Sequence, residues 1–209
     1  MVSDVDAGST YLTSSSIGTA APLDVGTSAN NVVQLDSTAK LPAVDGSQLT
    51  NVSAGGGKVL QVLQTVKTDV TSTTSTSAAD ITGMSVSITP SATTSKILVN
   101  FDIQGSADQS SGQNYHVHLV RDSSNIFQGD ADGSRVRCTV NGAESDGVGS
   151  SFHRSMMYLD SPSSTSAVTY KLQWQVQSGT LYLNREHQDA DGAGSGRFVS
   201  QITVMEIGA

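Results

Sequence analysis

The sequence predicts an all-β protein: an antiparallel jelly-roll or β-sandwich domain preceded by an extended, irregular N-terminal segment. Several runs alternate strictly between apolar and polar residues, which is the pattern of half-buried strands. Turn-forming residues separate these runs at spacings of about 8–15 residues, as in sandwiches and jelly rolls. The chain is also rich in serine, threonine and glycine, and hydrophobic residues make up 36% of its 209 residues. That composition favours strands and turns over a helical core.

The N-terminal segment, residues 1–57, lacks the periodicity of a helix or a strand. Its apolar residues are few and scattered, and it ends in the triple glycine 55–57, which is typical of a linker. Alone it buries too little apolar surface to offset the entropy of ordering. We therefore expect this segment either to be disordered or to become ordered by contact with other chains.

Residues 58–209 carry the strands. The strongest alternation runs from Val168 to Val176, where every second residue is apolar. Clear alternation also occurs over 84–89, 97–103 and 115–120, and weaker candidates are 59–70, 135–140, 152–159, 181–184 and 198–207. Turn signals lie at 121–125, 132–133, 141–142, 160–163 and 178–179. The pattern predicts roughly nine or ten strands in one domain, with no helix between them.

Composition excludes several classes of protein. The formal net charge of −8 argues against a nucleic-acid-binding surface, which needs a basic field. No apolar run approaches the roughly 18 residues of a membrane span, and the acidic start does not resemble a signal peptide. A single cysteine, Cys138, cannot form an internal disulfide, and its setting favours a small buried residue over a nucleophile. Oligomerisation is the usual alternative source of stability.

Two parts of the chain resemble proteins of tailed bacteriophages. Residues 26–36 and 40–52 contain Leu35-Asp36, then Lys40-Leu41-Pro42, then Asp45-Gly46-Ser47-Gln48-Leu49, which is similar to a linker phrase of tail fibres and other phage appendages. In those proteins the phrase leads into a distal head. Residues 58–209 resemble such a head over 59–69, 87–91, 95–99, 119–122, 159–162 and 201–207.

The resemblance implies a trimeric jelly-roll head, comparable in shape to tumour-necrosis-factor-like heads, on the exterior of a virion. The expected function is that of a fibre-type appendage that displays the head for binding a host-surface saccharide or protein. The alternative is a capsid decoration protein whose N-terminal segment grips the shell. In both cases we expect a homotrimer whose N-terminal segment, including Leu35, Leu41 and Leu49, contacts other virion proteins.

A metal-dependent enzyme is the third hypothesis. His116 and His118 lie on one face of a predicted strand, about 6.8 Å apart, which is similar to the metal-binding strand of cupins. The remaining cupin pattern is missing, and His153 and His187 lie in unrelated contexts, whereas a metal site needs three or four convergent ligands. The sequence has no nucleophile elbow and no phosphate-binding glycine loop before a helix. We therefore expect no catalytic residue, cofactor or metal site.

Two acidic loops remain as candidates for binding. The sequence Asp-Ala-Asp-Gly occurs at 130–133 and 189–192, but neither copy has the further ligands of a calcium loop, so polar turns are the simpler interpretation. The segment 184–197 is the longest polar stretch between predicted strands. Loops on a rigid β-scaffold often carry recognition, so we expect partner contacts there, at Glu186, His187, Asp189 and Asp191. A mobile loop without a ligand is the alternative.

Overall fold

The computed structural model describes residues 58–108, 113–144 and 151–208. These residues belong to the second of two units, Gly55–Ala209. The N-terminal segment 1–57 lies outside the described residues, and so do Leu35, Leu41 and Leu49. The predicted boundary at residue 57 and the predicted role of that segment stay predictions.

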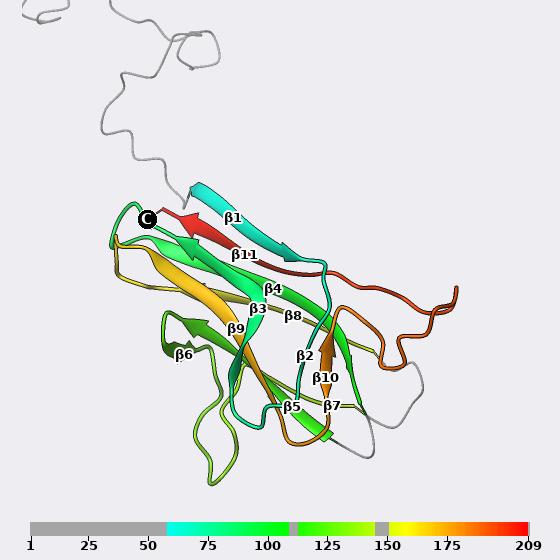
Figure 1. The fold of residues 1–209 in the computed structure, drawn as a ribbon. Coiled ribbons are helices and arrows are strands. Elements are labelled where there is room, and N and C mark those ends of the chain that lie inside the picture. The colour runs from blue at the N-terminus through cyan, green and yellow to red at the C-terminus, as the bar shows by residue number, and fades with distance from the viewer. Residues whose placement is uncertain (1–57, 109–112, 145–150, 209) are drawn as a thin grey trace, which may run out of the picture. The chain divides into compact units, whose positions relative to one another are not determined.

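The described residues form strands and turns but no helix, as predicted (Figure 1). The strands are β1 (Val59–Lys67), β2 (Thr71–Thr73), β3 (Ala79–Ile88), β4 (Lys96–Ala107), β5 (Gln113–Arg121), β6 (Ser124–Ile126), β7 (Val140–Glu144), β8 (Phe152–Asp160), β9 (Val168–Val176), β10 (Leu181–Leu183) and β11 (Ser200–Ile207). In this part of the chain, no helix has the length and hydrophobicity needed to cross a membrane.

The strands make two antiparallel sheets. In the β4 sheet, β8 lies on one side of β4, while β11 and β10 pair with successive parts of its other side; β1 pairs with β11 and β2 with β10. In the β5 sheet, β9 lies on one side of β5, β7 and β6 lie on the other, and β3 pairs with β9. The chain crosses between the sheets from β2 to β3, β3 to β4, β4 to β5, β7 to β8, β8 to β9 and β9 to β10. That order is the jelly roll predicted from the sequence.

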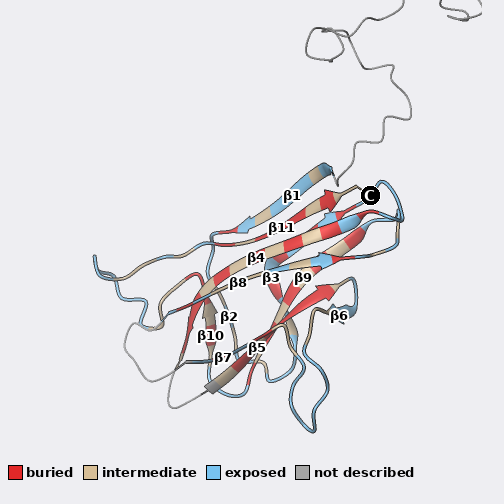
Figure 2. Ribbon diagram, turned by 180° about the vertical axis from the view of Figure 1, so that it is seen from behind, coloured by how far each residue is buried: buried red, intermediate tan, exposed pale blue. Residues whose placement is uncertain are grey.

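The core lies between the two sheets and follows the alternation of the sequence. Every second residue of β9 is buried, and Trp174, near its C-terminal end, is 3% exposed. Strand β4 repeats the pattern up to Ile103, so both sheets turn one apolar face inward (Figure 2). Of the described hydrophobic residues, 23 form one continuous core cluster. The core between the two sheets is therefore formed by residues of a single chain.

Two predictions near residue 140 are wrong. The segment 135–139 is not a strand, and Asn141-Gly142 is not a turn, because both residues lie within β7. Gly142 pairs with Tyr115, and a Cβ atom added to it would come 2.1 Å from Cζ of the tyrosine ring. Glycine is needed there for the close approach of that ring. Cys138 is half-buried instead of fully buried.

Other turn predictions are confirmed by backbone geometry. Positive φ angles occur at Asp122, Gly133, Ser163 and Gly179, each within or beside a predicted turn. Asp122 opens the tight hairpin between β5 and β6, which adds a short strand inside the segment predicted as a turn. Together with β2, β6 raises the strand number in the described residues to eleven.

Candidate functional site

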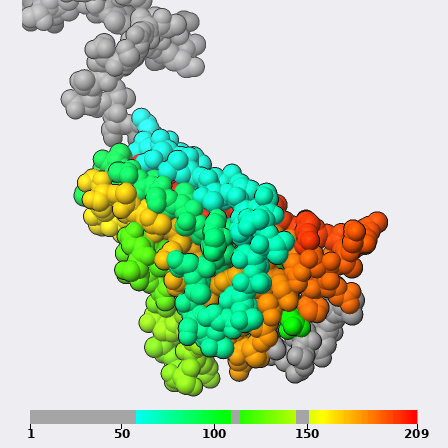
Figure 3. All heavy atoms as spheres, in the orientation of Figure 1, coloured from blue at the N-terminus to red at the C-terminus, as the bar shows by residue number. Residues whose placement is uncertain are grey.

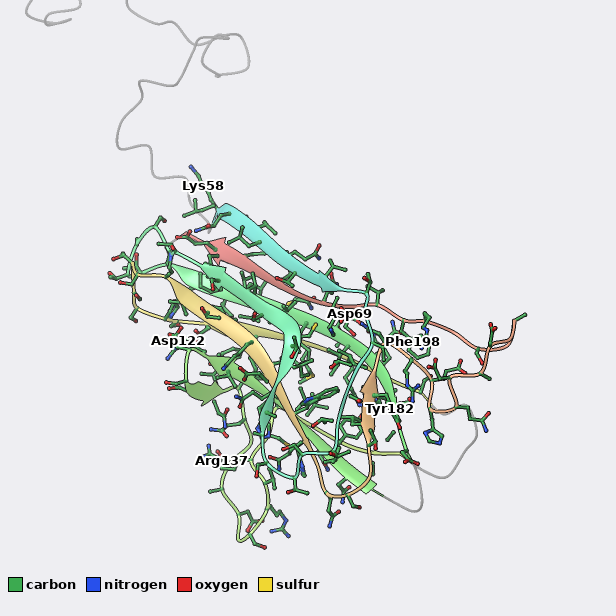
Figure 4. All side chains as sticks on the ribbon, viewed as in Figure 1. Lys58, Asp69, Asp122, Arg137, Tyr182 and Phe198 are labelled. Atoms are coloured by element: carbon green, nitrogen blue, oxygen red, sulfur yellow. The ribbon has the colours of Figure 1, made fainter. Side chains whose placement is uncertain are left out.

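The long loop between β10 and β11 is fixed at its base by Asn184. This residue is fully buried, has a φ of 65°, and makes hydrogen bonds in three directions. Its Nδ2 donates to the carbonyls of Lys67 and Asp69 at 2.8 and 3.0 Å, and its Oδ1 accepts from Ser200 Oγ at 2.7 Å. The loop therefore leaves the sheet from a rigid point. In Figure 4, Tyr182 and Phe198 lie on either side of this base.

Predicted partner-binding residues hold this loop together. Asp189 accepts a hydrogen bond from Arg185 at 2.7 Å and is also bonded to Arg197, and the bond from Arg197 is the main reason why its pKa is lowered. Glu186 Oε1 accepts from the backbone N–H of Gly196 at 3.1 Å. These carboxylates are therefore engaged within the loop, and a partner would have to compete with those bonds.

The other two predicted residues are placed differently. His187 Nε2 lies 3.7 Å from Asp108 Oδ1, and its ring is tilted against that of Tyr182 at 6.0 Å. Asp191 is exposed near the tip of the loop. Figure 3 shows this loop (orange to red) standing out from the sandwich, in a different direction from the loop 127–139 (yellow-green). The partner-binding role of the four residues stays a prediction.

The acidic loops do not present a set of calcium ligands. Asp189 is bonded to two guanidinium groups, and Asp132 Oδ2 accepts from Arg135 at 2.6 Å. Across the described residues, no group of three or more histidine, cysteine, aspartate or glutamate side chains is placed to hold a metal ion. A cation bound by Asp132 or Asp189 would have to compete with an arginine.

The histidine pair lies on the outer face of the β5 sheet. His116 pairs with Gln175 and His118 with Gln173, both on β9. His118 is 4% exposed, and neither of its ring nitrogens makes a hydrogen bond of normal geometry with another described residue, although Gln175 lies near. Burial lowers the pKa of both imidazoles, and the neighbouring His116 adds to the effect on His118. Burial therefore favours the neutral form of both rings.

His116 also lines a pocket of about 340 Å³ on this outer face. The floor comes from β5 and β9, and the walls come from the β2–β3 turn and the loop 127–139; the lining residues are Thr76, Asn114, His116, Val136, Gln175, Val176 and Gln177. The sequence pattern did not predict this pocket. The sequence feature that could have indicated it is the series of uncharged polar side chains at alternate positions of β5 and β9.

The outer face of the β4 sheet has the opposite character. A row of apolar residues crosses four strands in register: Val62, Met205, Leu98 and Leu159. The adjoining row consists of the polar residues Gln64, Thr203 and Asn100 and of Met157, which is 60% exposed, and a shallow groove of about 470 Å³ runs between the rows. Such a face, on a sandwich whose core is already filled, is typical of a protein–protein contact.

A contact between a histidine and an aspartate marks one end of this face. His153 Nε2 lies 2.8 Å from Asp102 Oδ2, joining β8 to β4. Sequence analysis placed His153 outside any site, and here it is an exposed partner of a carboxylate.

Comparison with protein-family models finds no match, and comparison with curated proteins also finds none. Among solved structures, one similar chain comes from the structure of infectious bursal disease virus, Gx strain. The sequences are 13% identical, the match covers 84% of this chain and 44% of that chain, and the TM-score is 0.33. This chain thus spans less than half the length of the matched chain. A likeness this weak does not support a fold assignment, so the jelly-roll fold is assigned from the order of the strands in the two sheets alone.

Proposed function

We propose that this protein is a non-enzymatic structural protein on the exterior of a tailed-phage virion. Residues 58–209 would form a jelly-roll head that assembles as a homotrimer, and residues 1–57 would attach it to other virion proteins. The preferred role is a fibre-type appendage that presents the head to the host surface. The resemblance of both regions to phage appendage proteins supports this role.

The observation that carries the proposal is the apolar outer face of the β4 sheet. Val62 and Leu159 are 53% and 52% exposed, at opposite ends of the same cross-strand row. Burial of apolar surface stabilises association by roughly 25 cal/mol per Å² before the costs of binding. A second and a third copy of this chain are the occupants we propose, because a closed trimer would cover the face and protect the free edges of β1 and β8.

The attachment role rests on the composition of residues 1–57. The 57 residues before the head have too little apolar surface to fold alone, and a segment ordered by its partner is usually the one that docks. A capsid decoration protein is the second candidate, because the resemblance to phage appendage proteins fits both roles.

The experiment is to locate and count the protein in purified phage particles. Quantitative mass spectrometry and a cryo-EM map should place it on the particle exterior, in multiples of three. A fibre would be present in few copies at the tail, and a decoration protein in hundreds of copies on the capsid. Absence from purified particles would refute both forms of the proposal.

A variant lacking residues 1–57 tests the division of labour. We expect this variant to fold and to trimerise but not to join particles when it is supplied in place of the full chain. Assembly of the truncated protein onto particles would show that the docking surface lies in the head.

A further inference from the structure

The pocket beside His116 is preformed. Gln177 N–H donates to the carbonyl of Asn114 at 2.9 Å, so the two floor strands remain paired to the edge of the pocket. The wall from the β2–β3 turn is anchored where Val176 N–H donates to the Ser75 carbonyl, also at 2.9 Å. The volume, about 340 Å³, is at the lower end of the range of small-molecule sites.

The second wall is the loop 127–139, which lies beside the β5 sheet in Figure 1 and carries Arg137 in Figure 4. Thr139 N–H donates to the Val117 carbonyl at 2.9 Å, and Gly129 N–H donates to the Cys138 carbonyl at 3.3 Å. These bonds attach the loop to β5 and close it upon itself. A ligand would therefore meet a fixed shape instead of ordering a free segment.

The lining is uncharged but rich in hydrogen-bonding groups. Asn114, Gln175 and Gln177 contribute amides, Thr76 a hydroxyl and His116 an imidazole. Of the described residues that line the pocket, none carries a carboxylate, an ammonium or a guanidinium group. His116 Nδ1 is buried and has no hydrogen-bond partner among the described residues. This atom is closed to solvent, so a ligand in the pocket would be held by the amide and hydroxyl groups.

We infer that this pocket is a binding site for a neutral saccharide. A sugar hydroxyl both donates and accepts, as do the amide side chains and the threonine hydroxyl, while Val136, which is 45% exposed, offers apolar surface to the C–H groups of a ring. An anionic sugar would enter a lining that offers its charge no cation, which disfavours it.

The inference rests on the proposed function in one respect, which is that the pocket must stay open in the proposed trimer. The outer faces of the two sheets point away from each other, so a trimer formed through the β4 sheet leaves the pocket open. Three pockets in one assembly would bind a multivalent glycan surface far more tightly than one pocket binds a free sugar. A surface glycan is therefore the source of the sugar to which we commit.

The test uses NMR on the full-length protein. The chain has four histidines, so their ring resonances form a small set. The resonances that are missing in a His116→Gln variant are those of His116. The probes are glucose, galactose, mannose, N-acetylglucosamine and N-acetylgalactosamine, with sialic acid as the charged comparison. We expect at least one neutral sugar to shift the His116 resonances saturably, and sialic acid to bind more weakly.

Variants then assign the site. Gln175→Ala and Gln177→Ala each remove an amide from the floor and should weaken binding by about tenfold, which corresponds to one lost hydrogen bond. The matched control is Gln188→Ala, which removes an exposed amide from the loop between β10 and β11 and should leave the affinity unchanged. The His187 resonances, in that same loop, should not respond.

Two results would overturn the inference. One is that no sugar of the panel shifts the His116 resonances; the other is that binding shifts His187 and is lost in Gln188→Ala, which would place the site in the long loop. Neither result depends on the oligomeric state, which light scattering measures on the same samples. A trimer that binds no sugar leaves the proposed function standing, and a monomer that binds sugar leaves this inference standing.

Discussion

A buried carboxylate joins the two sheets near one end of the sandwich. Asp160, on β8, is 4% exposed and accepts hydrogen bonds from Arg121 Nη1 at 3.0 and 2.9 Å and from Tyr170 Oη at 2.6 Å. The two donors belong to β5 and β9, which lie in the other sheet. Replacing Tyr170 by phenylalanine therefore tests how strongly this contact holds the sheets together.

The expected magnitude follows from the geometry. Tyr170→Phe keeps the fully buried ring and creates no cavity of ring size, but it removes one hydrogen bond to a charged group, which is worth about 1.5–3 kcal/mol. Asp160→Ala leaves the buried hydroxyl of Tyr170 without its partner and should cost about 3–5 kcal/mol. Arg121→Ala should cost about 1 kcal/mol, because the Arg121 side chain is 29% exposed and water can replace it.

The assay is urea unfolding followed by the fluorescence of the single tryptophan, at a fixed protein concentration because assembly contributes to stability. The three variants should rank Asp160→Ala, then Tyr170→Phe, then Arg121→Ala in loss of unfolding free energy. A Tyr170→Phe protein within about 0.5 kcal/mol of the parent would refute the reasoning. The hydroxyl would then contribute nothing beyond what water supplies.

Three further outcomes are expected. Trp174→Ala should lose about 3–5 kcal/mol in unfolding followed by circular dichroism, since the side chain is 3% exposed in the core, and a loss below about 1 kcal/mol would contradict its burial. Burial opposes ionisation of Glu206, but hydrogen bonds from Ser91 and Gln61 outweigh it and lower its pKa to about 2. The stabilisation from the ionised carboxylate is therefore present above pH 4.5 and is lost as the pH falls toward 2. In Glu206→Gln, the free energy of unfolding should depend less on pH between 4.5 and 2. The lowered pKa of His118 means that the unfolded chain binds its proton first, so stability should fall as the pH drops below 6.5, and His118→Gln should remove that part of the slope.

The strands could be predicted because burial in a two-layer fold imposes a period of two. Strand β9 is buried at every second residue along its whole length, and the sequence alternates in the same way. The alternation of apolar and polar residues does not indicate whether a glycine forms a turn or makes room for a neighbouring side chain. Gly142 carries the signal of a turn together with Asn141, but its role is to make room for the ring of Tyr115, a residue 27 positions earlier.

The candidate sites were harder to predict because they depend on register. Asn114 and Gln177 come together only because β5 pairs with β9 as it does, and Val136 joins them from a loop. The apolar row of the β4 sheet likewise combines β1, β11, β4 and β8, in which each strand contributes one residue. Alternation within one strand cannot reveal either arrangement, since both are properties of neighbouring strands.

The mass of the protein in solution tests the central claim most directly. Light scattering at micromolar concentration should give about three times the chain mass of 21.6 kDa. Met157→Glu, which places a charge on the apolar face, should give a folded monomer, whereas the control Val136→Glu, at an exposed position of the loop 127–139 beside the β5 sheet, should remain a trimer. A parent protein that is monomeric at this concentration, or a Met157→Glu variant that stays trimeric, would contradict assembly through the β4 sheet.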